Sequence, residues 1–364
     1  MKNKDFLLLK KLTESFGVSG NEEEIKELIL NEFKNENVTI SNDNLNSLII
    51  SYCSCSTLPK ISFYTHIDEV GFVITNILDN GFLNFQPIGG WYRHIVLGSK
   101  VVIKTKNNKK IIGIIGSEAP HFLSKEAQNK LLDFDNMSID LGLSSKEEVL
   151  QKGIQIGDFI MPYSETIVLN NEIISAKALD DRICATSLIL ALKEIIKKNI
   201  KTNIEAIFTV QEEVGCRGAK TSSFKSNSDV SFALDVTDSF DTPQSLSYDC
   251  KLNNGVALSV LDGGTIAHTG LLNFVKNTFN KHKIKYSYDP MNVGGTDSSQ
   301  IHLSKDGVIN MTISLPIRYM HSFYSVASFN DLYTLKNCVI SLIKNLNYDE
   351  LTKIKEYKYQ KLTK

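Results

Sequence analysis

The sequence predicts an α/β protein in which helices cover both faces of a mixed sheet, with a β-rich domain inserted into it. Its 364 residues are more than one hydrophobic core usually serves, so two domains are expected. Short β-type runs alternate with polar turns between residues 71 and 164, whereas helix and strand patterns alternate after residue 164. We therefore expect residues 1–70 and 165–364 to form the larger α/β domain and residues 71–164 to form the insert.

The N-terminal segment contributes one clear helix and two strands to the larger domain. A turn at Gly17–Gly20 precedes an apolar stripe of helical period, and Ser19 with Glu22 has the spacing of a capping box. Two β-type runs follow at Ser47–Tyr52 and Lys60–Tyr64.

The insert is dominated by short β-type runs and contains one clear helix. Ser144 and Glu147 have the capping-box spacing that predicts the start of this helix, and Gly153 predicts its end. The β-type runs occupy Phe72–Ile77, Lys100–Lys104 and Lys110–Ile115. Strands this short, separated by polar turns, favour a small β-rich domain.

After residue 164 the apolar patterns alternate between helix and strand. Helices are expected at Thr186–Lys198, Leu271–Lys281 and Asp331–Leu346, and strands at Ile204–Val210, Val230–Leu234 and Val308–Ser314. The strands are rich in apolar residues, which is typical of a sheet covered on both faces.

Charge and composition exclude several classes of partner. Forty basic residues nearly cancel forty-one acidic ones, so neither nucleic acid nor an anionic membrane is favoured as a partner. The chain has neither a signal-peptide core nor an apolar run long enough to span a bilayer. Cys53 and Cys55 form a C-x-C pair with no second pair after it, so we expect reduced thiols and a cytoplasmic location.

Acids and histidines follow several of the apolar runs. In open α/β sheets the ligand crevice lies beyond the carboxyl ends of the strands, so side chains at these points converge although they are far apart in sequence. The residues that follow the runs are His66 and Asp68, Glu212 and Glu213, Asp235, and His321, while Asp180 and Asp181 precede the Thr186–Lys198 helix.

Each of these residues also has an ordinary structural interpretation. A solitary H-x-D is more often a surface or core histidine than a ligand, an acidic pair is usually exposed, and Asp180 with Asp181 suits a helix N-terminus. Taken together, two histidines and several carboxylates form the ligand set that suits zinc, cobalt or manganese. A shared carboxylate can hold two such ions and activate a water between them.

Longer segments of the chain carry a family resemblance. They are THIDEVGFVI at 65–74, IGGWY at 88–92, IGSEAPHFL at 115–123, DLGLSSKEE at 140–148, AKALDDR at 176–182, TVQEEVGCRGAK at 209–220, DVTDSFDTP at 235–243, GGTDSSQIH at 294–302 and IRYMHS at 317–322. In these segments the chain resembles the tetrahedral (TET) or glutamyl aminopeptidases, which are dinuclear metallo-exopeptidases. The resemblance runs nearly from end to end.

The resemblance implies a role for each candidate residue. Asp180 would bridge two divalent metals, zinc or cobalt with manganese as a further option, and its peptide bond to Asp181 would be cis. His66 and Asp235 would complete one metal site, and Glu213 and His321 the other. The remaining roles concern residues beside the metals: Glu212 would be the general base, Asp68 would orient His66, and Asp181, Gly295, Thr296, Asp297 and Arg318 would support the site or line the substrate pocket.

The resemblance also implies an architecture, a substrate class and an assembly. The larger domain would be zinc-exopeptidase-like, and residues 71–164 would form a PDZ-like dimerisation domain. Dimers would assemble into a dodecamer, although a simple dimer is an alternative. The substrates would be peptides with free N-termini, from which single residues are removed. For Gly295, Thr296, Asp297 and Arg318 a purely structural role is an equal alternative.

Two rival functions remain to be tested. A glycosidase of the endoglucanase type would use Glu212 and another carboxylate as its acid and base, but it would not require His66 and His321. An inactive binding protein on the same fold is the second rival, although all five ligands and the base are present in the sequence. Neither the preferred N-terminal residue nor the metal used in the cell follows from the sequence.

Overall fold

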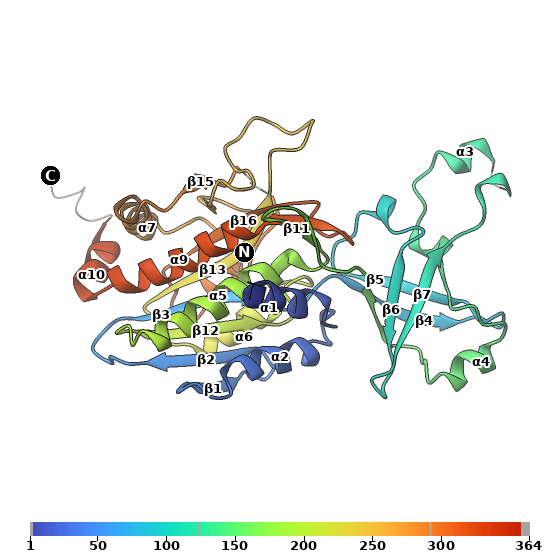
Figure 1. Ribbon diagram of the computed structural model, residues 1–364, viewed down its shortest axis with the longest axis horizontal. Helices are drawn as coiled ribbons and strands as arrows, with labels where there is room; N and C mark the ends of the chain where they lie inside the picture. Colours follow the sequence, from blue (N-terminus) through green and yellow to red (C-terminus); the bar gives the residue numbers. More distant parts are fainter. Residues whose placement is uncertain (1–2, 123, 291–292, 358–364) are drawn as a thin grey trace.

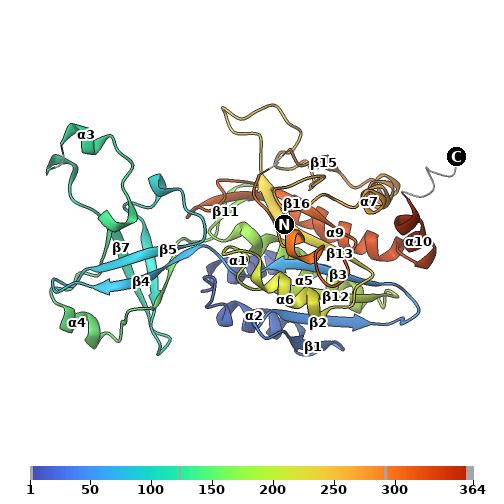
Figure 2. The ribbon, with the colours of Figure 1, turned by 180° about the vertical axis from the view of Figure 1, so that it is seen from behind.

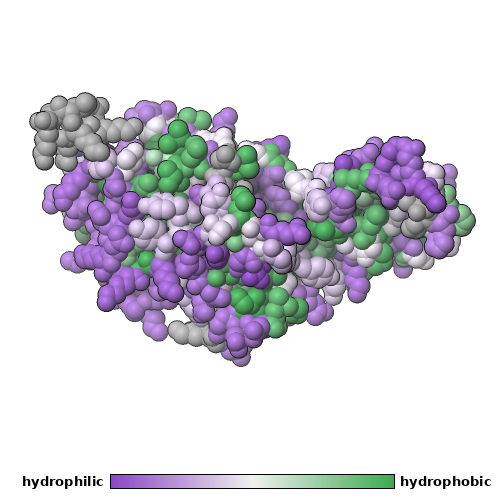
Figure 3. Space-filling model, turned by 90° about the horizontal axis from the view of Figure 1, so that it is seen from above, coloured by the Kyte–Doolittle hydropathy of each residue, from purple (hydrophilic) through white to green (hydrophobic). Residues whose placement is uncertain are grey.

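The protein consists of a larger α/β lobe and a narrower β-rich lobe (Figures 1 and 3). The computed structural model describes residues 3–122, 124–290 and 293–357. The larger lobe combines the beginning of the chain with everything after the insert, so segments far apart in sequence share one sheet. Among the described residues, no helix is both long and apolar enough to cross a membrane.

The larger lobe is built on an eleven-stranded mixed sheet. Its centre consists of four parallel strands in the order β12 (Asn203–Thr209), β3 (Lys60–His66), β13 (Val230–Asp238) and β16 (Asn310–Arg318). The flanking strands are β1 (Thr39–Asn42), β2 (Leu48–Cys53), β10 (Ile167–Asn170), β11 (Ile173–Ala176), β14 (Val256–Leu258), β15 (Tyr286–Tyr288) and β17 (Ser325–Ser328). The carboxyl ends of the parallel strands therefore lie along one edge of the sheet, as the sequence predicts.

Helices cover both faces of this sheet, which confirms the predicted fold class. Phe63 and its alternate neighbours pack with α5 (Leu179–Lys197) and α9 (Phe329–Asn345). Tyr64, which points to the opposite face, shares a cluster with residues of α6 (Arg217–Lys225) and α8 (Ser298–Ile301), and Figure 2 shows α6 from that side. The first face also carries α1 (Asn3–Glu14), α2 (Glu23–Phe33), α7 (Thr269–His282) and α10 (Tyr348–Glu356).

The insert is a closed barrel of six antiparallel strands. Its strands, in spatial order, are β4 (Gly71–Ile77), β5 (Leu83–Ile88), β8 (Ser138–Asp140), β7 (Lys110–Gly116), β6 (Lys100–Lys104) and β9 (Phe159–Pro162). Short helices α3 (Lys125–Gln128) and α4 (Lys146–Gln151) decorate it (Figure 1). The three strands that the sequence predicts here are present, whereas β5, β8 and β9 are additional.

Both predicted capping boxes are wrong in detail. Helix α2 begins at Glu23, and its N-cap residue Glu22 makes no side-chain capping bond, because Ser19 instead donates its hydroxyl to Asp68. In α4 the cap lies one residue later than predicted, since the hydroxyl of Ser145 accepts from the backbone of Glu148 at 3.3 Å. The α5 helix also begins seven residues before the predicted Thr186, which places two acids in its first turn.

Candidate metal centre

Three of the parallel strands deliver acids or histidines to the same edge of the sheet. His66 is the last residue of β3 and lies in register with Thr209, the last residue of β12. Glu213, which comes soon after the end of β12, therefore lies near His66. Asp235 belongs to β13, the strand on the other side of β3. His321 comes from the turn between β16 and β17, where its φ of 51° directs it back toward the sheet.

Asp180 lies between the two histidines. Its Oδ1 is 2.9 Å from Nε2 of His66, and its Oδ2 is 3.3 Å from Nε2 of His321. The same His321 nitrogen is 3.1 Å from Glu213, and Asp235 lies 3.9 Å from His66. The peptide bond between Asp180 and the next residue is cis.

Ligand atoms of His66, Asp180 and Glu213 lie within 4.8 Å of one another, and so do those of His66, Asp181 and Asp235. By distance alone, Asp181 is therefore also a candidate ligand beside His66 and Asp235. Asp180 contacts both histidines, whereas one oxygen of Asp181 accepts the hydroxyl of Thr65.

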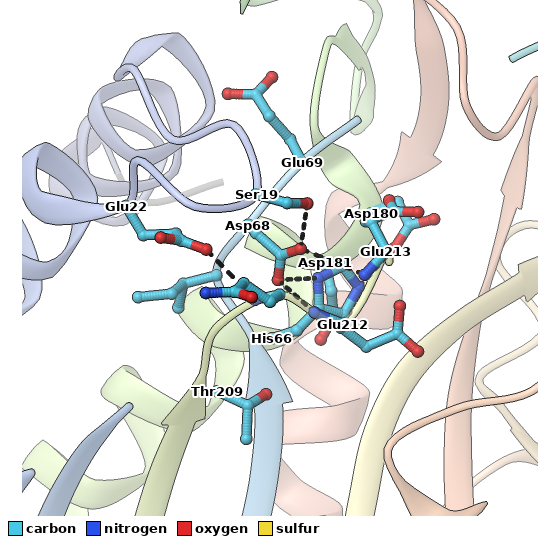
Figure 4. A network of polar contacts seen from close by, with 12 residues as sticks. Ser19, Glu22, His66, Asp68, Glu69, Asp180, Asp181, Thr209, Glu212 and Glu213 are labelled. Carbon is cyan, nitrogen blue, oxygen red and sulfur yellow. Dashed lines mark hydrogen bonds and ion pairs between the residues drawn. The ribbon is translucent and has the colours of Figure 1, made fainter. Parts of the chain in front are cut away.

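Asp68 holds the loop that carries both glutamates. One of its oxygens accepts from the backbone N–H of Glu212 at 2.9 Å, and the other accepts from the N–H of Glu213 at 3.1 Å and from the hydroxyl of Ser19 at 2.6 Å (Figure 4). Its Oδ1 also lies 3.4 Å from Nδ1 of His66. One buried carboxylate therefore holds the glutamate loop by two hydrogen bonds and lies next to the His66 ring.

Burial and mutual repulsion disfavour the charged forms of Glu213 and Asp235. Burial and the charge of Asp180 raise the pKa of Glu213, and burial raises the pKa of Asp235 well above its ordinary value, with Asp180 and Glu212 adding to the rise. Burial opposes the protonation of His321, but hydrogen bonds with Asp180 and Glu213 raise its pKa to about 11. Divalent cations would favour the charged carboxylates and the neutral imidazoles, so this donor set fits metal ions.

Glu212 lies beside this cluster in a different environment. Burial raises its pKa well above the ordinary value, and the charges of Asp297 and Glu213 raise it further. The hydroxyl of Thr209 donates to Asp297 at 2.5 Å, and Asp297 is itself buried. A carboxyl with a raised pKa that borders a cavity is suited to exchange protons.

A cavity of about 280 Å³ opens onto the cluster. Gly295 and Thr296 are among its lining residues, whereas Asp297 is buried and is not among them. The full lining comprises Gly90, Asp180, Glu212, Glu213, Asp235, Val236, Thr237, Ser259, Asp262, Asp289, Val293, Gly294, Gly295, Thr296, Ser314, Met320 and His321. A larger hollow of about 570 Å³ near Lys285 and Asp331 has no histidine among its described lining residues, so the smaller cavity is the better candidate for chemistry.

Arg318 and Trp91 have structural partners. The guanidinium of Arg318 donates to both oxygens of Asp241, at 2.7 and 2.8 Å, which agrees with its structural alternative. The Trp91 ring stacks on Phe72 with centroids 4.6 Å apart, and its N–H donates to the carbonyl of Gly71 at 3.0 Å. Neither contact involves the cluster of histidines and acids.

Sequence reasoning missed a buried ion cluster next to the site. Glu69 accepts from Lys177 with both oxygens at 2.8 Å and pairs with Arg182 at 3.3 Å, and all three side chains are buried. Arg182 also donates to the backbone carbonyls of Leu12 and Ile67. The LDDR segment and the residue after Asp68 were the available signals, but their pairing depends on the tertiary fold.

The sequence is similar to those of known proteins over most of its length. The sequence profile of the M42 glutamyl aminopeptidases matches residues 46–338. A putative aminopeptidase of Acetivibrio thermocellus is 37% identical over 338 residues, which cover 93% of this chain and 98% of that protein. The glutamyl aminopeptidase of Lactococcus lactis is 30% identical over 352 residues, covering 96% and 98% of the two chains.

Solved structures show the same architecture. The TET aminopeptidase of a marine sediment Thaumarchaeota archaeon superposes with a TM-score of 0.93 at 32% identity, covering 97% of this chain and all of that one. The TET1 peptidase of Pyrococcus horikoshii, which assembles into a tetrahedron or a large octahedral shell, superposes with a TM-score of 0.85 at 32% identity, covering 94% of this chain and all of that one.

Proposed function

The chain belongs to the M42 glutamyl aminopeptidase family, and on that premise we propose that it is a two-metal aminopeptidase that removes N-terminal residues from peptides. The observation that carries the proposal is the position of Asp180 between His66 and His321, with Glu213 and Asp235 beside it. Two histidines and three acids in contact are the donors expected of a pair of zinc or cobalt ions, with manganese as an alternative.

The five donors divide naturally between two ions that share Asp180. His66 and Asp235 would hold one ion, and Glu213 and His321 the other. When bound, such a pair lowers the pKa of a water between the ions and polarises the substrate carbonyl. The acids raise one another's pKa, and bound cations would supply the counter-charge that such a cluster of acids needs.

Glu212 would act as the general base. Its carboxylate borders the cavity, where it could take a proton from the attacking water and return it to the leaving amine. Asp68 would act as a positioning residue, because it holds the backbone of Glu212 and the ring of His66 at once.

The cavity lining favours a basic N-terminal residue. Besides the metal-centre acids it includes Asp262 and Asp289, and its described members include no lysine or arginine. One Asp262 oxygen accepts from the N–H groups of Gly264 and Thr265, while the other is buried with no hydrogen-bond partner among the described residues. Val236, Val293 and Met320 also line the cavity, and these apolar side chains suit the aliphatic stem of lysine or arginine.

We further propose that the protein is a homo-oligomer, up to a dodecamer. The support from this chain is a set of exposed apolar side chains on both lobes. Ile112 on barrel strand β7 is 55% exposed, and Leu169 on the edge strand β10 is 54% exposed. Exposed apolar positions on regular strands are typical of interfaces between subunits.

The activity is tested by stripping the protein of metal and measuring the hydrolysis of aminoacyl-anilides after adding zinc, cobalt or manganese. We expect activity that requires metal and a free α-amine, and a Glu212→Gln variant that binds metal normally but loses at least about a thousandfold in kcat. Hydrolysis of cellulose that resists chelation would favour the glycosidase alternative. A Glu212→Gln variant with unchanged peptide hydrolysis would refute the assigned base.

The preference for basic residues has its own test. Lysine and norleucine anilides differ by one ammonium group, and we expect kcat/KM to favour lysine by about tenfold, the effect of one hydrogen bond to a charged group. Asp262→Asn should move this ratio toward one. The matched control is Asp249→Asn, an exposed acid outside the lining, which should leave the ratio unchanged. Equal rates for both substrates would refute the preference without affecting the proposed activity.

A further inference from the structure

A third cluster of donors includes Glu212 but neither of the two site histidines. It consists of Glu212, Cys216 and Asp297, whose ligand atoms lie within 4.8 Å of one another. The cluster shares no residue with the five donors assigned to the metal pair. It therefore raises the question of what a thiol does beside the proposed general base.

The chain places the Cys216 thiol there through a tight turn. The backbone N–H of Cys216 donates to the carbonyl of Glu212 at 2.8 Å, and both Gly215 and Cys216 have positive φ angles, of 118° and 51°. As a result, Sγ lies 3.0 Å from a Glu212 carboxylate oxygen and 3.4 Å from the carbonyl of Thr296. The Cys216 side chain is nearly buried, but Glu212 and Thr296 line the cavity, so the cluster adjoins a path to solvent.

Asp297 supplies an unused acceptor on the other side. It is 3% exposed, and its Oδ2 accepts the Thr209 hydroxyl, whereas its Oδ1 is buried with no hydrogen-bond partner among the described residues. A buried carboxylate oxygen without a partner is costly. Such an atom, close to a second carboxylate and a thiol, is the feature that a cation would satisfy.

We propose that Glu212, Cys216 and Asp297 form an inhibitory site for a soft divalent cation, zinc in excess or cadmium. A thiolate with two carboxylates suits these ions and disfavours magnesium or calcium, which prefer oxygen ligands alone. Binding breaks the S–H bond of Cys216, forms a sulfur–metal bond and releases the proton to solvent, with no change of oxidation state. The Glu212 carboxylate becomes a ligand of the cation, so it can no longer accept a proton as the general base.

The proposal rests on the proposed function for its inhibitory effect, but binding can be measured without it. The protein loaded with two zinc ions per chain is titrated with cadmium, and the ultraviolet thiolate-to-cadmium charge-transfer band is recorded together with the cadmium content. Cys53 is exposed and Cys55 is partly exposed, so both are first replaced by serine to remove a competing thiol pair. Cys216→Ser, in the same background, keeps a hydroxyl but removes the soft ligand.

We expect the protein with Cys53→Ser and Cys55→Ser to bind one further cadmium ion per chain and to show the charge-transfer band. The same protein with Cys216→Ser should show neither the further cadmium ion nor the band. For each protein we measure the cadmium concentration that halves its own uninhibited rate of peptide hydrolysis. This concentration should be at least about tenfold higher for Cys216→Ser. Losing only the hydrogen-bond partner of a ligand typically lowers metal affinity about tenfold or more, and losing the ligand itself should lower it further. Cys216→Ala should behave like Cys216→Ser, and circular dichroism should show both variants folded.

Two results would overturn the proposal: no band that depends on Cys216, or the same inhibition midpoint with and without the thiol. Cadmium binding through Cys216 in a protein that hydrolyses no peptide would retain this site and refute the proposed function. Peptide hydrolysis that requires two zinc ions, without a third site, would do the reverse.

Discussion

Asp68→Asn should weaken metal binding as well as destabilise the fold. The two backbone N–H groups of Glu212 and Glu213 donate to different oxygens of Asp68. Whichever way an asparagine amide is turned, one of these N–H groups faces an NH₂ group. The lost bond to a charged acceptor costs about 1.5–3 kcal/mol, and the loop bearing both glutamates shifts as a consequence.

The effect on metal affinity follows from the second role of this carboxylate. Asp68 also lies 3.4 Å from the His66 ring, and removing the partner that orients a metal-binding histidine typically lowers affinity by about 10–100-fold. The assay is equilibrium dialysis against zinc-buffered solutions, with the zinc content of each protein measured per chain. We expect the half-saturating zinc concentration to rise by about this factor, and kcat to fall at saturating zinc because Glu212 is displaced.

The chain offers a matched control for this substitution. Asp331 is 2% exposed, and its two oxygens also accept separate backbone N–H groups, from Asn253 at 2.7 Å and Gly255 at 3.0 Å. Asp331→Asn should therefore destabilise the protein to a similar extent in urea denaturation but leave zinc affinity unchanged. If both variants bound zinc like the unmodified protein, the idea that Asp68 holds the metal centre would be wrong.

Further predictions concern stability and assembly. Burial lowers the pKa of Lys177 beside Glu69 to about 8, so between pH 8 and 10.5 the unfolded chain binds more protons than the native one. The free energy of unfolding should therefore rise with pH across this window by up to about 3 kcal/mol, relative to Lys177→Met, in urea denaturation at several pH values. Gly71→Ala should cost about 1–3 kcal/mol, because its Cβ would lie 2.7 Å from a backbone oxygen, whereas Gly116→Ala, with nothing within 4 Å, should be neutral in the same assay. Ile112→Glu should lower the molecular mass seen in sedimentation if β7 forms a subunit contact, and an unchanged mass would exclude that contact.

The sequence was sufficient for the α/β alternation and for the edge where the site lies. The central strands are buried on both faces, so they were recognisable as runs rich in apolar residues, and acids directly after such runs meet at one edge. The strands of the barrel were harder to predict from the sequence. Strands β5, β8 and β9 are three to six residues long, and two of them contain proline, so their pairing depends on contacts distant in sequence.

Local signals failed where a side chain had a better tertiary partner. Ser19 has the sequence context of an N-cap, yet its hydroxyl bonds to buried Asp68, which offers a charged acceptor. For Arg318 the sequence left a pocket role and a structural role open, and Asp241 binds its guanidinium with both oxygens. In each case the competing partner is remote in sequence, and no spacing rule could reveal it.

The barrel also contributes to the geometry of the site. Phe323, two residues beyond His321, is buried in the barrel's own hydrophobic cluster and packs on Trp91 with ring centroids 5.3 Å apart. Gly90, next to Trp91, lines the cavity, and a Cβ at this position would lie 3.2 Å from Nδ1 of His321. The barrel core thus fixes both the His321 turn and the loop that packs against it. His321 is thus held by packing against the barrel, whereas Asp180 is held by the larger lobe. A change that shifts the barrel relative to the sheet would therefore move His321 away from Asp180. The insert and the metal centre should be regarded as one structural unit.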